Sequence, residues 1–270
     1  MHLIDTHTHL YSEAFDEDRD SVIHLAFQSG VQHFFLPAID SQYTPGMLNL
    51  KDRYPENMHL MAGLHPTHVK EATVEAELQH VLESLNSKKY VAVGEIGIDL
   101  YWDKSTLRIQ QLAFKRQIAL AKAFDLPIVI HCRDAFDEVF EILEEEKENR
   151  LRGIFHCFTG TEAQAKQAID LNMRVGIGGV VTFKNGKIDQ FLERIDLKHI
   201  VLETDAPYLA PKPFRGKRNS SEYLSLVAQK IAEIHQLTLE EVALQTTKNA
   251  LEIFNMTEKI LIPNPQSNPS

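Results

Sequence analysis

The feature that most restricts the fold of this chain is a regular alternation of short apolar segments with longer amphipathic ones. Eight apolar segments have the length of strands, and most are too uniformly apolar for a sheet with one face in water. The pattern predicts strands at residues 3–8, 33–36, 58–64, 90–96, 127–131, 153–157, 174–177 and 199–204. It predicts helices at residues 18–29, 47–52, 74–86, 107–124, 135–147, 162–171, 188–195, 221–235 and 239–254.

Strands buried on both faces, each followed by a helix, form a parallel sheet. Eight such units in about 250 residues indicate an α/β fold, a single (β/α)8 TIM barrel with an additional C-terminal helix. An open doubly wound sheet is the alternative. It usually has a glycine-rich nucleotide-binding turn after its first strand, where this chain has His7-Thr8-His9.

Length and composition favour one domain. The chain has 270 residues, 43% of them hydrophobic, which is enough for one large core over residues 1–262. Residues 263–270 are polar and proline-rich and are expected to be a flexible tail. The net charge of −10 argues against a broad cationic surface that coats duplex nucleic acid.

Cysteine usage and hydropathy indicate a cytoplasmic protein. Cys132 and Cys157 form no C-x-x-C motif, and strand alternation turns each away from the histidine before it, so both are expected to be small buried apolar residues. The sequence shows no signal-like start and no apolar run of about 20 residues, so no membrane partner is expected.

Histidines and carboxylates gather where the predicted strands end. His7 and His9 end the first strand, His65 follows the third, Glu95 ends the fourth, His131 the fifth and His156 the sixth, and Glu203 and Asp205 close the eighth. Because the carboxyl ends of barrel strands share one mouth, we expect these groups to converge. Other histidines, such as His24 and His80, fall on predicted helices and are interpreted as structural.

The converging groups predict a metal centre. Imidazoles mixed with carboxylates favour a divalent ion, and four histidines with two carboxylates exceed the needs of one tetrahedral ion. We therefore expect two ions, about 3.5 to 4 Å apart, of magnesium, zinc, manganese or nickel. One would bind His7, His9 and Asp205, the other His131 and His156, with Glu95 as the bridge. Water activated between the ions would be the nucleophile, and Asp205 is placed to accept its proton.

Cations near the predicted mouth favour an anionic substrate. Arg133 follows a predicted ligand, and the loop after the eighth strand, a frequent phosphate site in barrels, carries Lys212, Arg215, Lys217 and Arg218. The alternative is that these loop cations only aid solubility. Three aromatic residues near the mouth either stack bases or cover the core: Tyr101, Trp102 and Phe158.

Seven short motifs follow one another along the chain: Asp5-Thr6-His7-Thr8-His9, Gly63-Leu64-His65-Pro66, Gly94-Glu95-Ile96-Gly97-Ile98-Asp99, Ile130-His131-Cys132-Arg133-Asp134, His156-Cys157-Phe158-Thr159-Gly160, Leu202-Glu203-Thr204-Asp205-Ala206-Pro207 and Arg215-Gly216-Lys217-Arg218-Asn219. In this order the sequence resembles the TatD family of metal-dependent deoxyribonucleases, a branch of the amidohydrolase-like barrels. The motifs span nearly the whole chain, and the ordered set is highly specific.

The resemblance implies a TIM-type barrel, a two-metal centre at the residues above, and phosphodiester hydrolysis, typically 3′-to-5′ exonuclease action on DNA. The expected DNA substrate is single-stranded or a 3′ end, and a monomer is expected. The resemblance also implies that His65 and Arg215 approach the substrate phosphate, and that Glu203 lies in the active-site shell. We place Arg133 and Lys217 with the substrate contacts, and Glu95, Glu203 and Asp205 with the catalytic groups.

Two departures from the family's pattern affect the expected substrate pocket. Thr67 stands where the family often has a histidine, and Asn219-Ser220-Ser221 replaces the common Asn-Glu-Pro.

A hydrolase of small-molecule esters or amides on the same barrel is the alternative enzyme. Many such enzymes bridge their metals with a modified lysine at the end of the fourth strand, where this chain has Glu95. A nucleic-acid-binding scaffold without catalysis is a third reading, which the complete ligand set disfavours.

Overall fold

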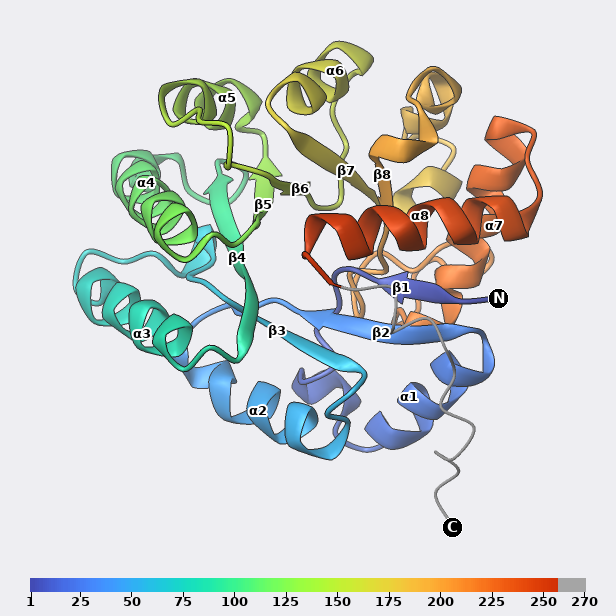
Figure 1. The fold of residues 1–270 in the computed structure, drawn as a ribbon, viewed down its shortest axis with the longest axis horizontal. Helices are drawn as coiled ribbons and strands as arrows, with labels where there is room; N and C mark the ends of the chain where they lie inside the picture. Colours follow the sequence, from blue (N-terminus) through green and yellow to red (C-terminus); the bar gives the residue numbers. More distant parts are fainter. Residues whose placement is uncertain (257–270) are drawn as a thin grey trace.

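The structure, a computed structural model, describes residues 1–256, and within them eight strands form one parallel sheet in sequence order. The strands are β1 Leu3–Asp5, β2 Val31–Leu36, β3 Met58–Ala62, β4 Tyr90–Asp99, β5 Ile128–Arg133, β6 Gly153–Phe155, β7 Met173–Ile177 and β8 Ile200–Leu202. Figure 1 shows them around a common centre with the helices outside. The predicted (β/α)8 barrel is confirmed, and the tail predicted at 263–270 lies outside the described residues.

The barrel closes between β8 and the segment that follows β1. The backbone N–H and the hydroxyl of Thr6 both donate to the carbonyl oxygen of Leu202, at 3.0 and 2.9 Å. Further along, the backbone N–H of Asp205 donates to the carbonyl oxygen of His7 at 2.9 Å. Two segments from opposite ends of the chain therefore run side by side at the mouth of the barrel.

One α-helix follows each strand from β1 to β6, only 3-10 turns lie between β7 and β8, and two α-helices follow β8. The α-helices are α1 Arg19–Gln28, α2 Thr44–Arg53, α3 Val74–Asn86, α4 Leu107–Phe124, α5 Phe136–Glu145, α6 Glu162–Asp170, α7 Leu224–His235 and α8 Leu239–Ile253. The helix predicted at 188–195 is wrong: two 3-10 turns, Ile188–Gln190 and Leu192–Arg194, occupy it, because Phe191 between them has φ −135° and leaves the helical region. No helix among residues 1–256 is long and apolar enough to cross a membrane.

The last helix, α8, closes the amino-terminal end of the barrel (Figure 1). The inward-facing side chains pack against the end of this helix as one buried cluster: Ile4, Phe35, Met61, Ala92, Val129, Ile154, Val201, Ala250, Leu251, Ile253 and Phe254. The rings of Phe35 and Phe254 stack with their centres 3.8 Å apart. The apolar filling stabilises this end, which leaves the opposite end for polar groups.

Replacing Phe254 with alanine should lower the free energy of unfolding by about 3–5 kcal/mol, the usual loss for a buried phenylalanine. The matched control is Leu244→Ala on the same helix, where the side chain is 70% exposed and the expected change is within about 0.5 kcal/mol. Urea denaturation followed by circular dichroism measures both. Equal losses in the two variants would show that the end of α8 does not seal the barrel.

Candidate metal centre

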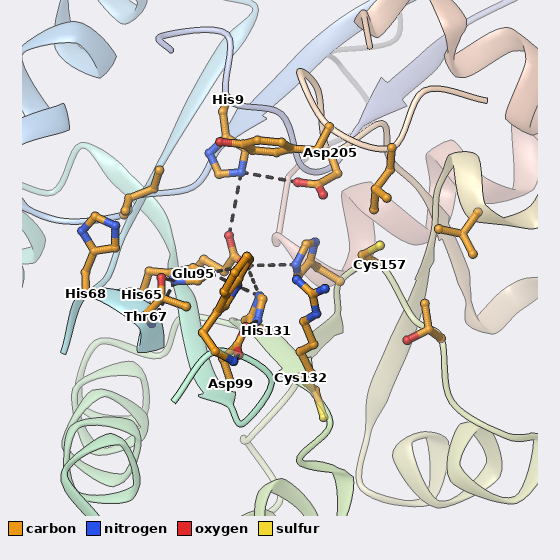
Figure 2. Close-up of a pocket in the computed structure, with 18 residues that line it drawn as sticks. His9, His65, Thr67, His68, Glu95, Asp99, His131, Cys132, Cys157 and Asp205 are labelled. Atoms are coloured by element: carbon orange, nitrogen blue, oxygen red, sulfur yellow. Dashed lines mark hydrogen bonds and ion pairs between the residues drawn. The ribbon is translucent and has the colours of Figure 1, made fainter. Parts of the chain in front are cut away.

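Glu95 lies at the centre of a group of histidines at the mouth of the barrel (Figure 2). It does not end its strand as predicted, because β4 continues to Asp99. The register with β5 shifts between Gly94 and Ile96, so Glu95 is an extra residue in the pairing. Such a bulge re-aims a side chain, and here the carboxylate, 2% exposed, points into the barrel mouth.

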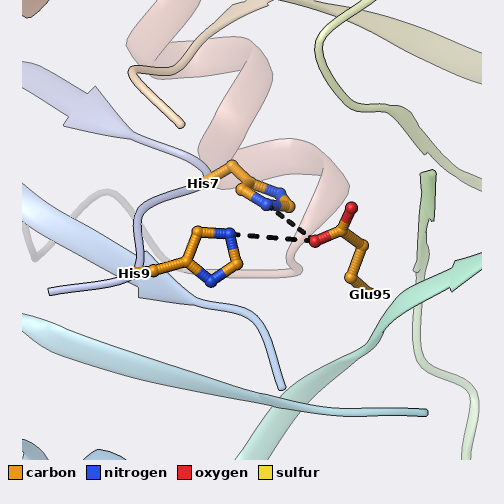
Figure 3. A group of neighbouring side chains, drawn as sticks. All are labelled: His7, His9 and Glu95. Atoms are coloured by element: carbon orange, nitrogen blue, oxygen red, sulfur yellow. Dashed lines mark ion pairs between the residues drawn. The ribbon is translucent and has the colours of Figure 1, made fainter. Parts of the chain in front are cut away.

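The two carboxylate oxygens of Glu95 face different histidines. Its Oε2 lies 3.1 Å from Nε2 of His7 and 3.9 Å from Nε2 of His9 (Figure 3). Its Oε1 lies 2.8 Å from Nδ1 of His131 and 2.9 Å from Nε2 of His156. One carboxylate thus stands between two sets of imidazoles, the geometry that a bridging ligand requires.

Asp205 stands beside the first set of imidazoles. Its Oδ1 lies 3.4 Å from Nε2 of His9 and 3.7 Å from Nε2 of His7. Among residues 1–256, three groups have ligand atoms close enough to hold an ion: His7, His9 and Glu95; His7, His156 and Asp205; and His65, Glu95 and His131. The structure therefore brings all six predicted ligands together, and it adds His65 on distance alone.

Hydrogen bonds fix which nitrogen of His9 faces the centre. The hydroxyl of Tyr11 donates its one proton to the carbonyl oxygen of Pro37 at 2.5 Å. It therefore accepts a hydrogen bond from Nδ1–H of His9, 2.7 Å away, and the lone pair of His9 lies on Nε2 toward Asp205. Sequence reasoning missed Tyr11, and its only signal was its place two residues after the His7-Thr8-His9 motif.

Asp99 has the same role for His131. Its Oδ2 lies 2.8 Å from Nε2 of His131, so that nitrogen donates and Nδ1 faces Glu95. Burial raises the pKa of Asp99, but the bond to His131 outweighs it and the pKa is lowered. The amide of Gln110 holds the backbone of Asp99 through two bonds, of 2.8 and 3.0 Å. Sequence reasoning did not single out Asp99, although it shares a strand face with Glu95 four residues earlier.

His65 differs from His9 and His131 in the protonation of the nitrogen that faces the centre. The backbone N–H of Thr67 donates to Nδ1 of His65 at 3.2 Å, so this nitrogen carries the lone pair, and the hydroxyl of Thr67, 2.7 Å from the same nitrogen, then also donates to it. Burial lowers the pKa of His65 to about 4, which keeps the ring neutral, and the bond from Thr67 to Nδ1 leaves the one proton on Nε2. That N–H points toward Oε1 of Glu95, 3.3 Å away. His65 therefore offers a hydrogen-bond donor to the centre, where His9 and His131 offer lone pairs.

The environment fits divalent cations. His7 is fully buried, and within the described residues neither ring nitrogen makes a hydrogen bond of good geometry, although Nε2 lies 3.1 Å from Oε2 of Glu95. Such burial is costly unless another ligand satisfies the ring. Burial opposes ionisation of Glu95 and Asp205, but the nearby histidines, first His156 for Glu95 and His9 for Asp205, lower both pKa values. Burial also opposes protonation of His156, yet Glu95 raises the pKa of this ring well above its usual value. The site favours positive charge.

Glu203, expected among the catalytic groups, lies behind His156 and does not line the cavity. It is fully buried, its Oε1 accepts the backbone N–H of Cys157, and the same oxygen lies 3.6 Å from Nδ1 of His156. A Cβ at Gly176 would stand 2.3 Å from its Oε2, so this position needs glycine to leave room for the carboxylate. The position of Glu203 suits it to orient His156.

A cavity of about 610 Å³ opens over the metal-binding groups, and Arg133 lines it. Cys132 and Cys157 also line it and are half-buried, so the expectation that both are buried is wrong. Burial raises the pKa of both thiols, which disfavours thiolate ligands.

Phe158 is buried in the core, which leaves only Tyr101 and Trp102 of the three aromatic residues exposed.

The cations of the loop after β8 do not line this cavity. The guanidinium of Arg215 lies 4.4 Å from the ring centre of Phe183, and Nζ of Lys217 lies 5.9 Å from that of Phe214. Arg218 forms an ion pair with Asp18 at 2.6 Å. The structure thus places Arg133 with the metal-binding groups and separates the loop cations from them.

Comparison with known proteins decides the family. The family model described as "TatD related DNase" matches residues 4–255. The chain belongs to the TatD family. YabD of Bacillus subtilis, named an uncharacterized metal-dependent hydrolase, is 40% identical over 94% of this chain and 99% of its own. The "3'-5' ssDNA/RNA exonuclease TatD" of Pantoea ananatis is 31% identical over 94% of this chain and 100% of its own.

A solved structure supports the same family. The crystal structure of YjjV, a TatD homologue from Escherichia coli K12, superposes with a TM-score of 0.87 at 31% identity. The match covers 94% of this chain and 98% of that one. The TatD fold and metal-dependent hydrolysis thus agree with the cluster of histidines and carboxylates at the mouth of this chain.

Replacing Asp99 with asparagine should reduce metal affinity about 10- to 100-fold, because His131 loses the anionic partner that fixes its ring. Asp103→Asn is the matched control, since Asp103 lies four residues later in the loop after β4 and only caps a short 3-10 turn. Titration with a chelating indicator measures affinity, and circular dichroism checks folding. Equal affinity in the Asp99→Asn variant and the unaltered protein would remove Asp99 from the metal centre.

Proposed function

We propose that this chain removes nucleotides from the 3′ ends of DNA by hydrolysing phosphodiester bonds with two divalent ions. The observation that carries the proposal is the division of one carboxylate, Glu95, between two sets of imidazoles. One ion would be held by His7, His9 and Asp205, the other by His131 and His156, with Glu95 between them. The family description and the name of the Pantoea ananatis relative support DNA as the substrate.

The residues around the ions have separate tasks. When bound, the ions supply a water nucleophile near neutral pH and positive charge toward the phosphoryl group. Asp205, ionised and at the mouth, accepts the proton of the attacking water. His65 donates its Nε2–H to one phosphoryl oxygen, and Arg133 binds another. Glu203 keeps His156 in position from behind.

Arg215 and Lys217 would act on a more distant part of the strand. The ring under Arg215 lines a second hollow, which shares Thr159 and Val180 with the metal cavity. The two hollows are therefore adjacent, and a strand longer than one nucleotide would pass from the first to the second. In this position Arg215 binds a backbone phosphate without touching the scissile bond, and Lys217 on the same loop adds positive charge.

The direct test uses a single-stranded DNA oligonucleotide labelled at its 5′ end. Cleavage should shorten it from the 3′ end in single-nucleotide steps, stop in a chelator, and return with excess magnesium, manganese, zinc or nickel. Gel electrophoresis resolves the products. If the oligonucleotide stays intact while the protein hydrolyses small esters or amides in a metal-dependent way, the nuclease proposal is overturned in favour of the small-molecule enzyme.

The two arginines should differ in how their effects depend on substrate length. Arg133→Ala should raise KM about ten-fold on a dinucleotide and on a twelve-nucleotide strand alike, because it loses a charged hydrogen bond beside the metals. Arg215→Ala should raise KM only on the longer strand. Arg116→Ala, on the outer face of α4, is the control and should change neither value. The same length dependence in both arginine variants would contradict their assignment to separate positions.

A further inference from the structure

Trp102 is the single tryptophan of the chain, and it is exposed on the wall of the metal cavity. Its side chain is 71% exposed, and the neighbouring Tyr101 is 54% exposed, with the two ring centres 5.0 Å apart. Large aromatic rings left in water beside a binding cavity are typical of sites where a ligand covers them.

The loop that carries Trp102 is attached to the metal centre. The backbone N–H groups of Tyr101 and Trp102 donate to Oδ1 of Asp99, at 3.0 and 3.2 Å. The other oxygen of the same carboxylate holds His131 at 2.8 Å. One side chain therefore fixes both a candidate metal-binding imidazole and the start of the loop that carries the indole.

A cation completes the wall. The guanidinium of Arg133 lies 3.8 Å from the ring centre of Tyr101 and 5.7 Å from that of Trp102. It has no carboxylate partner among the described residues. An aromatic face next to a free guanidinium matches a nucleotide, which offers a flat base to stack and a phosphate to pair.

We propose that Trp102 stacks on an unpaired nucleobase adjacent to the scissile phosphodiester, and that this contact determines which strands are cut. The inference rests on the proposed nuclease function and names a specificity residue for it. A base inside a duplex is covered on both faces by its neighbours, so the indole reaches only bases in single strands or frayed 3′ ends. The contact reads the flat face of the base, which DNA and RNA share.

The test compares two single-stranded oligonucleotides of equal length, one ending in 3′ thymidines and one ending in abasic residues. The unaltered protein should cleave the thymidine end about ten-fold more efficiently by kcat/KM, mainly through KM. Trp102→Ala should bring this ratio close to one, and Trp102→Phe should keep most of it. Leu244→Ala, exposed on α8 at the opposite end of the barrel, is the control with an unchanged ratio.

Fluorescence gives a second readout that needs no turnover. Because Trp102 is the only indole, its emission should be quenched by the thymidine strand and much less by the abasic strand. An unchanged ratio in Trp102→Ala, or equal quenching by both strands, would overturn the stacking role. Failure of the unaltered protein to cut either strand would count against the nuclease function, and the quenching would still decide the role of Trp102.

Discussion

The position of the candidate metal centre depends on how β8 closes against β1. Asp5, the last residue of β1, is fully buried, and its two oxygens accept the backbone N–H and the hydroxyl of Thr204 at 2.9 and 2.6 Å. Burial raises the pKa of Asp5 to about 7, while the bonds to Thr204 act in the opposite direction. These bonds hold together the segments that carry His7 and Asp205. Without this closure, two groups from opposite ends of the chain would not meet.

From the apolar core toward the mouth, each group of residues positions the group above it. Above the apolar cluster, Glu203 lies behind His156. Glu95 lies on the other side of His156, between the two sets of imidazoles. Asp99 then joins the metal-binding layer to the aromatic rim through Trp102. Displacing one supporting residue should therefore affect function more than stability, because metal ligands and substrate contacts require accurate placement.

Much of this architecture was predictable from the sequence because it depends on periodicity. Both ends of the helices Val74–Asn86 and Leu107–Phe124 agree with the predicted bounds, and the six predicted ligands meet because barrel strands share a mouth. The helix predicted at 188–195 failed because its apolar residues are buried without a continuous helix, in two 3-10 turns and the residues that flank them. Periodicity alone does not distinguish these arrangements.

Apart from Glu203, the sequence did not reveal the residues that act through another residue. Asp5, Tyr11 and Asp99 touch a candidate ligand or hold its backbone, and no spacing rule identifies such partners. The cationic loop shows the converse difficulty. Its charge was visible in the sequence, but Arg215 packs over Phe183 outside the metal cavity, which only tertiary structure reveals.

The hydrogen-bond partners also distinguish candidate ligands that distance alone does not separate. By distance alone His65 belongs with Glu95 and His131. The backbone N–H of Thr67 occupies its lone pair, however, so His65 turns a proton toward the centre. Asp99 does the reverse for His131, because an anionic acceptor draws the proton to the far nitrogen. Identical side chains at one mouth thus differ in whether they turn a lone pair or a proton toward Glu95, and the groups behind them make this difference.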